Sequence, residues 1–116
     1  VQIASFQLMQ EKLARMMGTI QAMLLLCWRT TKLMEEGKAT MGMIGMTKAW
    51  VTLRGREVCA LGREMFGGNG ITFDNYVMKA MCDMEAMYTY EGTYDVNSFV
   101  TGRELTGIAA FKASKK

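Results

Sequence analysis

Two long stretches of the chain carry apolar residues at helical spacing. Between about residues 6 and 36 the apolar positions recur every three or four residues, which places them on one face of a long amphipathic helix. A second such stretch runs from about residue 40 to Phe66, with its arginines on the opposite, wet face. Gly37 lies between them and offers a left-handed cap. Two long helices joined this briefly are expected to pack antiparallel.

The second half of the chain carries shorter periodic segments. Three glycines within residues 67–70 predict a tight turn after the second helix, because glycine permits positive φ and weakens regular structure. Asp74 can cap a shorter helix that fades near Asp83. The segment 85–90 has no clear period and is expected to be irregular.

A last helix is expected to begin at Thr93 or Glu91 and to end at Gly107. The pattern as a whole predicts an all-α fold, an up-and-down four-helix bundle over residues 1–107. Residues 108–116 are expected to form a C-terminal tail.

The composition supports an all-helical protein and excludes several functions. The sequence has no proline and 13 methionines among its 116 residues, so nothing interrupts long helices. A net charge of +3, from mixed charges along the whole length, is too small for a nucleic-acid surface. With no histidine and three scattered cysteines, no metal site is expected. The most apolar stretch, residues 16–28, is too short to span a membrane.

Glu91 is the candidate for acid–base chemistry. It precedes Gly92 at the entry of a predicted helix, and Tyr88 and Tyr90 flank it. Aromatic neighbours can exclude water from a carboxylate beside an apolar ligand, and such a carboxylate can act as a base. The alternative is an ordinary acidic residue in the first turn of a helix, where the helix dipole favours it. Spacing alone leaves both interpretations open.

The glycine-rich run at residues 67–70 is a second candidate site. Without side chains to hold a ligand off, its backbone amides could approach a phosphate or a ring system. A plain turn between helices is the alternative. The run is not a dinucleotide fingerprint, because no strand precedes it, and it lacks the lysine of a phosphate-binding loop.

Two motifs, in this order and at this distance, resemble the C-terminal domain of acyl-CoA dehydrogenases. They are LGREMFGGNGI at residues 61–71 and TYEGT at residues 89–93, followed by TGR at residues 101–103. The resemblance covers essentially the whole chain. Three segments are most similar to glutaryl-CoA dehydrogenases and to plant-type short-chain acyl-CoA oxidases: TYEGTYD at residues 89–95, residues 102–108 and the Ala-Phe pair at 110–111.

The resemblance implies roles for individual residues. Glu91 would be the catalytic base, and Gly92 would lie against the substrate. The implied cofactor is FAD, which would contact Thr93 and Phe111. Further flavin contacts would be made to a neighbouring subunit by Gln7, Glu64, Met65, Phe66, Gly67 and Gly68. Glu64 departs from the glutamine that many relatives have, which affects its side-chain contact only.

The resemblance also implies an activity and a larger protein. The expected reaction is FAD-dependent α,β-dehydrogenation of an acyl-CoA thioester, short-chain or glutaryl, to a trans-2-enoyl-CoA. Electrons would pass to an electron-transfer flavoprotein in the mitochondrial matrix, with the peroxisome as the alternative. Relatives add an N-terminal helical domain and a middle β domain and assemble as homotetramers, so this chain alone is not expected to be competent. Two alternatives stay open: an oxidase that passes electrons to oxygen, and a non-catalytic paralogue or assembly subunit with the same bundle.

Overall fold

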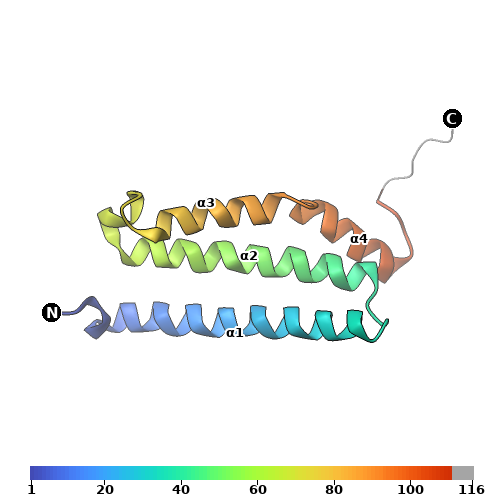
Figure 1. Ribbon diagram of the computed structural model, residues 1–116, viewed down its shortest axis with the longest axis horizontal. Helices are drawn as coiled ribbons and strands as arrows, with labels where there is room; N and C mark the ends of the chain where they lie inside the picture. The colour runs from blue at the N-terminus through green and yellow to red at the C-terminus, as the bar shows by residue number, and fades with distance from the viewer. Residues whose placement is uncertain (111–116) are drawn as a thin grey trace.

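The computed structural model describes residues 1–110, and the regular secondary structure of this part of the chain is entirely helical. The four α-helices are α1 (Gln7–Glu35), α2 (Met41–Met65), α3 (Tyr76–Thr89) and α4 (Tyr94–Thr106), as Figure 1 shows. Two short 3₁₀ helices, η1 (Ile3–Ser5) and η2 (Gly67–Ile71), precede α1 and follow α2. No strand occurs in residues 1–110, so the predicted all-α class with four helices is confirmed.

The helix α2 is the centre of the molecule. The helix α1 lies antiparallel along one side of α2, while α3 and α4 follow one another along the other side (Figure 1). The result is an elongated molecule of 65 × 33 × 22 Å. The sequence pattern did not predict that α3 and α4 run in the same direction, because the short break between them does not reverse the chain.

Local signals fix both ends of the connection between α1 and α2. Gly37 follows α1 with φ 68°, the left-handed conformation that glycine adopts without strain. The side chain of Thr40 then caps α2 by accepting a hydrogen bond of 3.2 Å from the amide of Met43. These boundaries agree with the predicted ones.

Small residues bring α2 and α4 close together. Gly42, Gly45 and Ala49 are buried on the same face of α2. A Cβ atom at Gly45 would lie 2.9 Å from the backbone oxygen of Asn97 in α4, closer than packed atoms normally approach. The hydroxyl of Thr101 in α4 donates to the carbonyl of Gly42 in α2 at 2.9 Å. We call these three small residues of α2 the seam.

Polar contacts join α1 to α2. The hydroxyls of Thr30 and Thr47, both buried, lie 2.6 Å apart. Near the other end of the two helices, Lys12 pairs with Glu64 at 2.7 Å.

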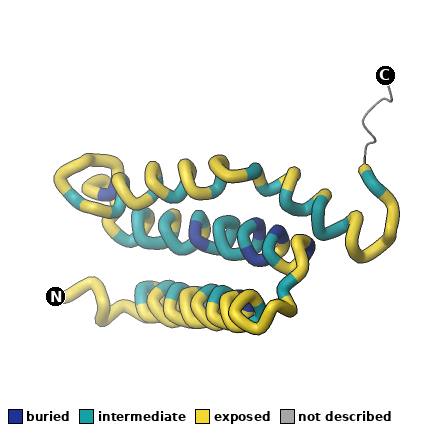
Figure 2. The backbone as a smooth tube through the Cα atoms, turned by 45° about the vertical axis from the view of Figure 1, so that its right-hand side comes forward, coloured by how far each residue is buried: buried dark blue, intermediate teal, exposed yellow. Residues whose placement is uncertain are grey.

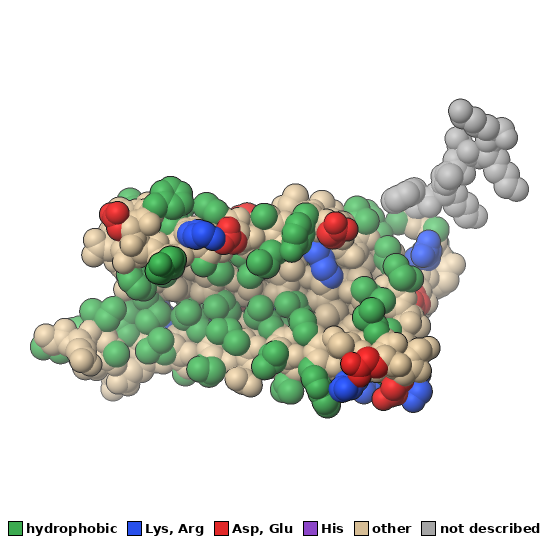
Figure 3. Space-filling view, viewed as in Figure 1, with side chains coloured by type: hydrophobic (Ala, Val, Ile, Leu, Met, Phe, Trp, Pro, Cys, Tyr) green, Lys and Arg blue, Asp and Glu red, His purple; other side chains and the backbone are tan. Residues whose placement is uncertain are grey.

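Apolar residues are largely exposed in this chain. Within residues 1–110 Ala49 is the single buried apolar residue, and Figure 2 shows the buried positions gathered mainly on α2 while most of α1 is exposed. Figure 3 shows hydrophobic side chains along the visible face of both α1 and α3. The exposed apolar residues of α1 include Leu8, Leu13, Met17, Ile20, Leu24, Leu25, Trp28 and Met34. A surface of this kind is typical of a domain that packs against further protein.

The helix α3 differs from its prediction at both ends. It continues to Thr89, so the predictions that it fades near Asp83 and that residues 85–90 are irregular are wrong. Arg56 of α2 pairs with Glu85 at 2.6 Å and holds this last part against the bundle. At the other end the N-cap residue is Asn75 instead of Asp74, and its side chain makes no capping hydrogen bond.

The helix α4 begins and ends where the sequence indicates. Its N-cap is Thr93, whose hydroxyl accepts a hydrogen bond from the amide of Val96, and Gly107 follows its last residue with φ 72°. None of the helices in residues 1–110 combines the length and apolar character that a membrane span requires.

Candidate functional site

The break between α3 and α4 holds a strained backbone at Glu91. We call residues 90–93, which form this break, the Glu91 loop. Glu91 has φ 53° and Gly92 has φ 91°. Glu91 is the one residue other than glycine with positive φ in residues 1–110. This conformation costs about 1–2 kcal/mol for a residue with a Cβ atom. Strain of this kind persists where the surroundings fix it, and it is concentrated at functional sites.

Glu91 lies just before α4 and not in its first turn. Thr93 is the N-cap, and the acidic residue in the first turn of α4 is Asp95. Glu91 therefore precedes the helix by two residues instead of lying in its first turn. The interpretation of Glu91 as an ordinary first-turn acid is wrong, and Asp95 has that place.

A lysine of α2 binds the backbone on both sides of Glu91. The Nζ atom of Lys48 donates to the carbonyl oxygen of Tyr88 at 3.2 Å and to that of Gly92 at 2.5 Å. It also lies 5.9 Å from the centre of the Tyr90 ring. Burial lowers the pKa of Lys48, while the nearby negative charge of Glu91 acts in the opposite direction. The ammonium thus sits in a partly desolvated position beneath the loop.

An asparagine of α4 holds the second half of the loop. The Nδ2 atom of Asn97 donates to the carbonyl oxygens of Gly92 at 2.8 Å and Thr93 at 3.1 Å. A Cβ atom at Gly92 would lie 2.9 Å from the same nitrogen. Both this contact and the positive φ require glycine at position 92.

Aromatic and charged side chains surround the end of α3. The rings of Tyr88 and Tyr94 stack with centroids 5.8 Å apart, and the guanidinium of Arg56 lies 4.3 Å from the centre of the Tyr88 ring. Tyr90 is 57% exposed and Glu91 is also exposed. Tyr88 and Tyr90 therefore do not exclude water from the Glu91 carboxylate by themselves, and Glu91 lies on the surface of this chain.

The remaining predicted site residues lie elsewhere in the molecule. Gln7 begins α1, and Glu64 to Gly68 end α2 and enter η2, at the end of the molecule where α1 starts (Figure 1). Glu91, Gly92 and Thr93 lie away from that end, between α3 and α4 (Figure 1). The structure thus brings the candidates together in two separate groups. Phe111 lies outside the described residues.

The group near η2 has an open backbone and a paired carboxylate. A Cβ atom at Gly67 or Gly68 would have nothing within 4 Å, so a planar or anionic ligand can approach the backbone there. The hydrogen bond from Lys12 lowers the pKa of Glu64, so the carboxylate of Glu64 is charged and bound to that lysine. Gly70 is buried, and its Cβ atom would overlap the carbonyl oxygen of Arg63.

Lys48 and Asn97 are the site residues that the sequence did not reveal. The sequence offers a weak signal for Lys48, which stands among the small buried residues Gly45 and Ala49 where a charged side chain is unusual. Asn97 gives no comparable signal. Its role depends on hydrogen bonds to a loop whose conformation cannot be read from residue types.

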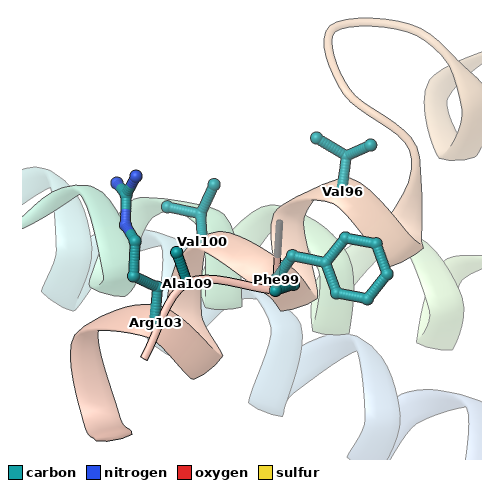
Figure 4. Close-up of a pocket in the computed structure, with 6 residues that line it drawn as sticks. Val96, Phe99, Val100, Arg103 and Ala109 are labelled. Carbon is teal, nitrogen blue, oxygen red and sulfur yellow. The ribbon is translucent and has the colours of Figure 1, made fainter. Parts of the chain in front are cut away.

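Two hollows within residues 1–110 are lined by residues other than Glu91. One of about 100 Å³ lies beside α4, lined by Val96, Phe99, Val100, Arg103, Ala109 and Ala110 (Figure 4). A larger one of about 420 Å³ lies between α1 and α2 and is lined partly by Arg15, Arg54, Glu57 and Glu64. Residues 1–110 also contain no cluster of three or more His, Cys, Asp and Glu that could hold a metal ion.

Comparison with known proteins matches nearly the whole chain to one family. The model of the acyl-CoA dehydrogenase C-terminal domain matches residues 1–105. The probable acyl-CoA dehydrogenase FadE25 of Mycobacterium tuberculosis is 31% identical over 104 residues, which are 89% of this chain and 27% of that protein.

Solved structures give the same result. A glutaryl-CoA dehydrogenase from Mycobacterium smegmatis superposes with a TM-score of 0.88 at 30% identity, over 95% of this chain and 28% of that one. A second structure, of a glutaryl-CoA dehydrogenase from Mycobacterium smegmatis in complex with FADH2, gives a TM-score of 0.87 at 28% identity, over 94% and 28%.

The chain therefore spans little more than a quarter of the length of these relatives. The family model, the sequence identity and the shared arrangement of helices agree. The chain belongs to the acyl-CoA dehydrogenase family and corresponds to its C-terminal helical domain.

Proposed function

We propose that the protein to which this chain belongs is an FAD-dependent acyl-CoA dehydrogenase, and that Glu91 is the base that removes the α-proton of the substrate. The observation that carries this proposal is the strained conformation of Glu91 in the loop between α3 and α4. A residue with φ 53° is held there by two side chains from neighbouring helices. Family membership then connects this carboxylate to a specific reaction.

The chemistry assigned to this chain is proton transfer at the α-carbon of a thioester. An acyl-CoA bound over the loop would place its α-carbon beside the Glu91 carboxylate and its carbonyl oxygen near the backbone amide of Glu91. A hydrogen bond to that oxygen stabilises the charge that develops when the proton leaves. Closure of the site by the acyl chain expels water and strengthens this contact. The exposure of Glu91 in this chain leaves room for such a ligand.

The two groups of candidate residues fit an FAD that reaches two subunits. Gly67 and Gly68 leave open space over the backbone for a planar or anionic group, and Thr93 lies beside the base. FAD, when bound, supplies the acceptor for the hydride of the β-carbon. Because Gln7 and residues 64–68 lie at one end of the molecule, away from Glu91, we propose that they serve the cofactor of a neighbouring subunit in a homo-oligomer.

We propose glutaryl-CoA or a short-chain acyl-CoA as the substrate. The support is the similarity to two glutaryl-CoA dehydrogenase structures together with residues 102–108. An electron-transfer flavoprotein is the proposed acceptor of the electrons. Domains outside this chain would complete the substrate pocket, since Glu91 is exposed on the surface of this chain.

Anaerobic mixing of the full-length flavoprotein with glutaryl-CoA and with butyryl-CoA tests the proposal. We expect the absorbance of the oxidised flavin to fall, and the faster of the two reactions identifies the preferred acyl chain. Glu91→Gln is expected to keep the flavin but to slow the reaction by about 10²- to 10⁴-fold, the usual contribution of a general base. Asp95→Asn is the matched control, because it removes a nearby exposed carboxylate that stands in the first turn of α4.

Three results would contradict the proposal or a part of it. Equal rates for the wild type and Glu91→Gln would remove Glu91 from the chemistry. A flavin that no short, long or dicarboxylic acyl-CoA reduces would favour a non-catalytic bundle. Stoichiometric hydrogen peroxide on admission of air would replace the proposed acceptor by oxygen.

A further inference from the structure

Lys48 binds the backbone that carries the proposed base. It belongs to α2, far from the loop in sequence, yet its two hydrogen bonds go to the carbonyls of Tyr88 and Gly92. These two carbonyls precede and follow Glu91. The ammonium therefore ties the backbone on both sides of the base to the central helix.

The hydrogen bond from Lys48 to the Tyr88 carbonyl stabilises the C-terminal end of α3. Tyr88 stands in the last turn of α3, where carbonyl groups have no partner within the helix. A positive charge is favoured at this end, and α3 carries no basic residue of its own in its last turn. Lys48 supplies that charge from the neighbouring helix.

The hydrogen bond from Lys48 to the Gly92 carbonyl stabilises the Glu91 loop. Positive φ at both Glu91 and Gly92 is unfavourable without external contacts, and the carbonyl of Gly92 accepts from both Lys48 and Asn97. Hydrogen bonds from a charged donor are about twice as strong as neutral ones. Because the ammonium binds backbone carbonyls, the carboxylate of Glu91 is left available for a ligand.

We propose that Lys48 is a positioning residue for Glu91: by bonding the carbonyls of Tyr88 and Gly92, it fixes the loop conformation that aims the carboxylate at the α-carbon of the substrate. The inference rests on the proposed function of Glu91. The partial desolvation of Lys48, which lowers its pKa, fits an ammonium that lies between α2 and the loop. Arg56, the other cation near the end of α3, is engaged with Glu85 and the Tyr88 ring and does not replace it.

The test compares Lys48→Gln with Lys79→Gln in the full-length flavoprotein. Lys79 is an exposed lysine of α3 that pairs with Asp83 at 2.5 Å, outside the loop, so it controls for the loss of a surface charge. Flavin content is measured first. Anaerobic stopped-flow with glutaryl-CoA or butyryl-CoA, whichever reduces the wild type faster, then gives the limiting rate of flavin reduction and the half-saturating concentration.

We expect Lys48→Gln to change the limiting rate of flavin reduction much more than the half-saturating concentration. Lys48→Gln is expected to lower the limiting rate about ten- to a hundredfold, because a small misplacement of a reacting group has effects of this size. The half-saturating concentration should change by less than about threefold, since the lost contact does not bind the substrate. Lys79→Gln is expected to match the wild type in both quantities.

A merely structural role would give a different result. The inference is overturned if the limiting rate per bound flavin in Lys48→Gln equals that of the wild type. If Lys48→Gln yields no folded flavoprotein, Lys48→Arg decides, because a broad planar guanidinium cannot place its donors at the same point as a compact ammonium. A limiting rate lowered by at least about threefold with unchanged half-saturation supports the inference, and an unchanged rate overturns it. If no acyl-CoA reduces the flavin of the wild type, the proposed function and this inference are both overturned. If the wild type and the Lys48 variant are reduced at equal rates, this inference alone is overturned.

Discussion

Alanine in place of Gly45 is expected to destabilise the protein, although alanine favours a helix. Gly45 is buried in the seam where α2 approaches α4. The new Cβ atom would lie 2.9 Å from the backbone oxygen of Asn97 and 3.4 Å from the hydroxyl of Thr101. A backbone oxygen cannot turn aside as a long side chain can. The whole of α4 would have to move outward to make room.

The size of the effect follows from two opposing contributions. Replacing glycine by alanine within a helix stabilises it by about 1 kcal/mol. Inserting a methyl group into a tightly packed contact costs about 1–3 kcal/mol. The free energy of unfolding should therefore fall by about 1 kcal/mol, because the clash exceeds the gain in helix propensity. Asn97 also holds the Glu91 loop, so the rate of flavin reduction should fall as well.

Gly62→Ala is the matched control for this prediction. Gly62 lies in the same helix, but a Cβ atom there would lie 3.6 Å from the methyl group of Met16, an ordinary contact. This variant should gain the helix propensity without the clash and become more stable by about 1 kcal/mol. Thermal unfolding of the full-length flavoprotein compares the two. A Gly45→Ala protein that melts at or above the temperature of Gly62→Ala would refute the reasoning.

Three further predictions follow from contacts between and within helices. Thr30→Val and Thr47→Val should each lower the free energy of unfolding by about 1 kcal/mol, and the double variant by less than their sum, because both lose the same buried hydrogen bond. If urea denaturation shows that the losses of unfolding free energy in the two single variants add up in the double variant, the two hydroxyls do not stabilise the protein through a shared hydrogen bond. Glu104→Ala should cost about 1 kcal/mol, since its carboxylate accepts from the amide of Gly42 at 2.8 Å at the start of α2. An unchanged melting temperature would contradict this cap. Burial raises the pKa of the Cys59 thiol, so alkylation by iodoacetamide, followed by mass spectrometry, should modify the exposed Cys82 first. Earlier modification of Cys59 would contradict the burial.

Helix ends that depend on local chemistry could be predicted from the sequence. Gly37 and Gly107 adopt positive φ after α1 and α4, and Thr93 caps α4 with its own hydroxyl. Each of these residues acts on a backbone group within a few positions of itself. Residue types are therefore sufficient to locate these boundaries and, with the apolar periodicity, the all-α class.

Features that depend on distant partners could not be predicted in this way. The last turn of α3 is held by the pair of Arg56 with Glu85 and was expected to be irregular. The common direction of α3 and α4 depends on how the Glu91 loop is folded. Glu91 itself was found from its motif, but Lys48 could be assigned only from its distances to the loop. Periodicity gives no information about which side chain reaches a carbonyl many residues away.

Helix packing and the geometry of the proposed base depend on the same contacts. Lys48 stands between Gly45 and Ala49, so the close approach of α2 and α4 also places its ammonium beneath the Glu91 loop. Asn97 contributes to both, since its backbone oxygen faces Gly45 and its side chain binds Gly92. A strained residue keeps its conformation only where its surroundings fix it. Here α2 and α4 provide that fixation, so a change in the seam should alter the proposed chemistry as well as the stability.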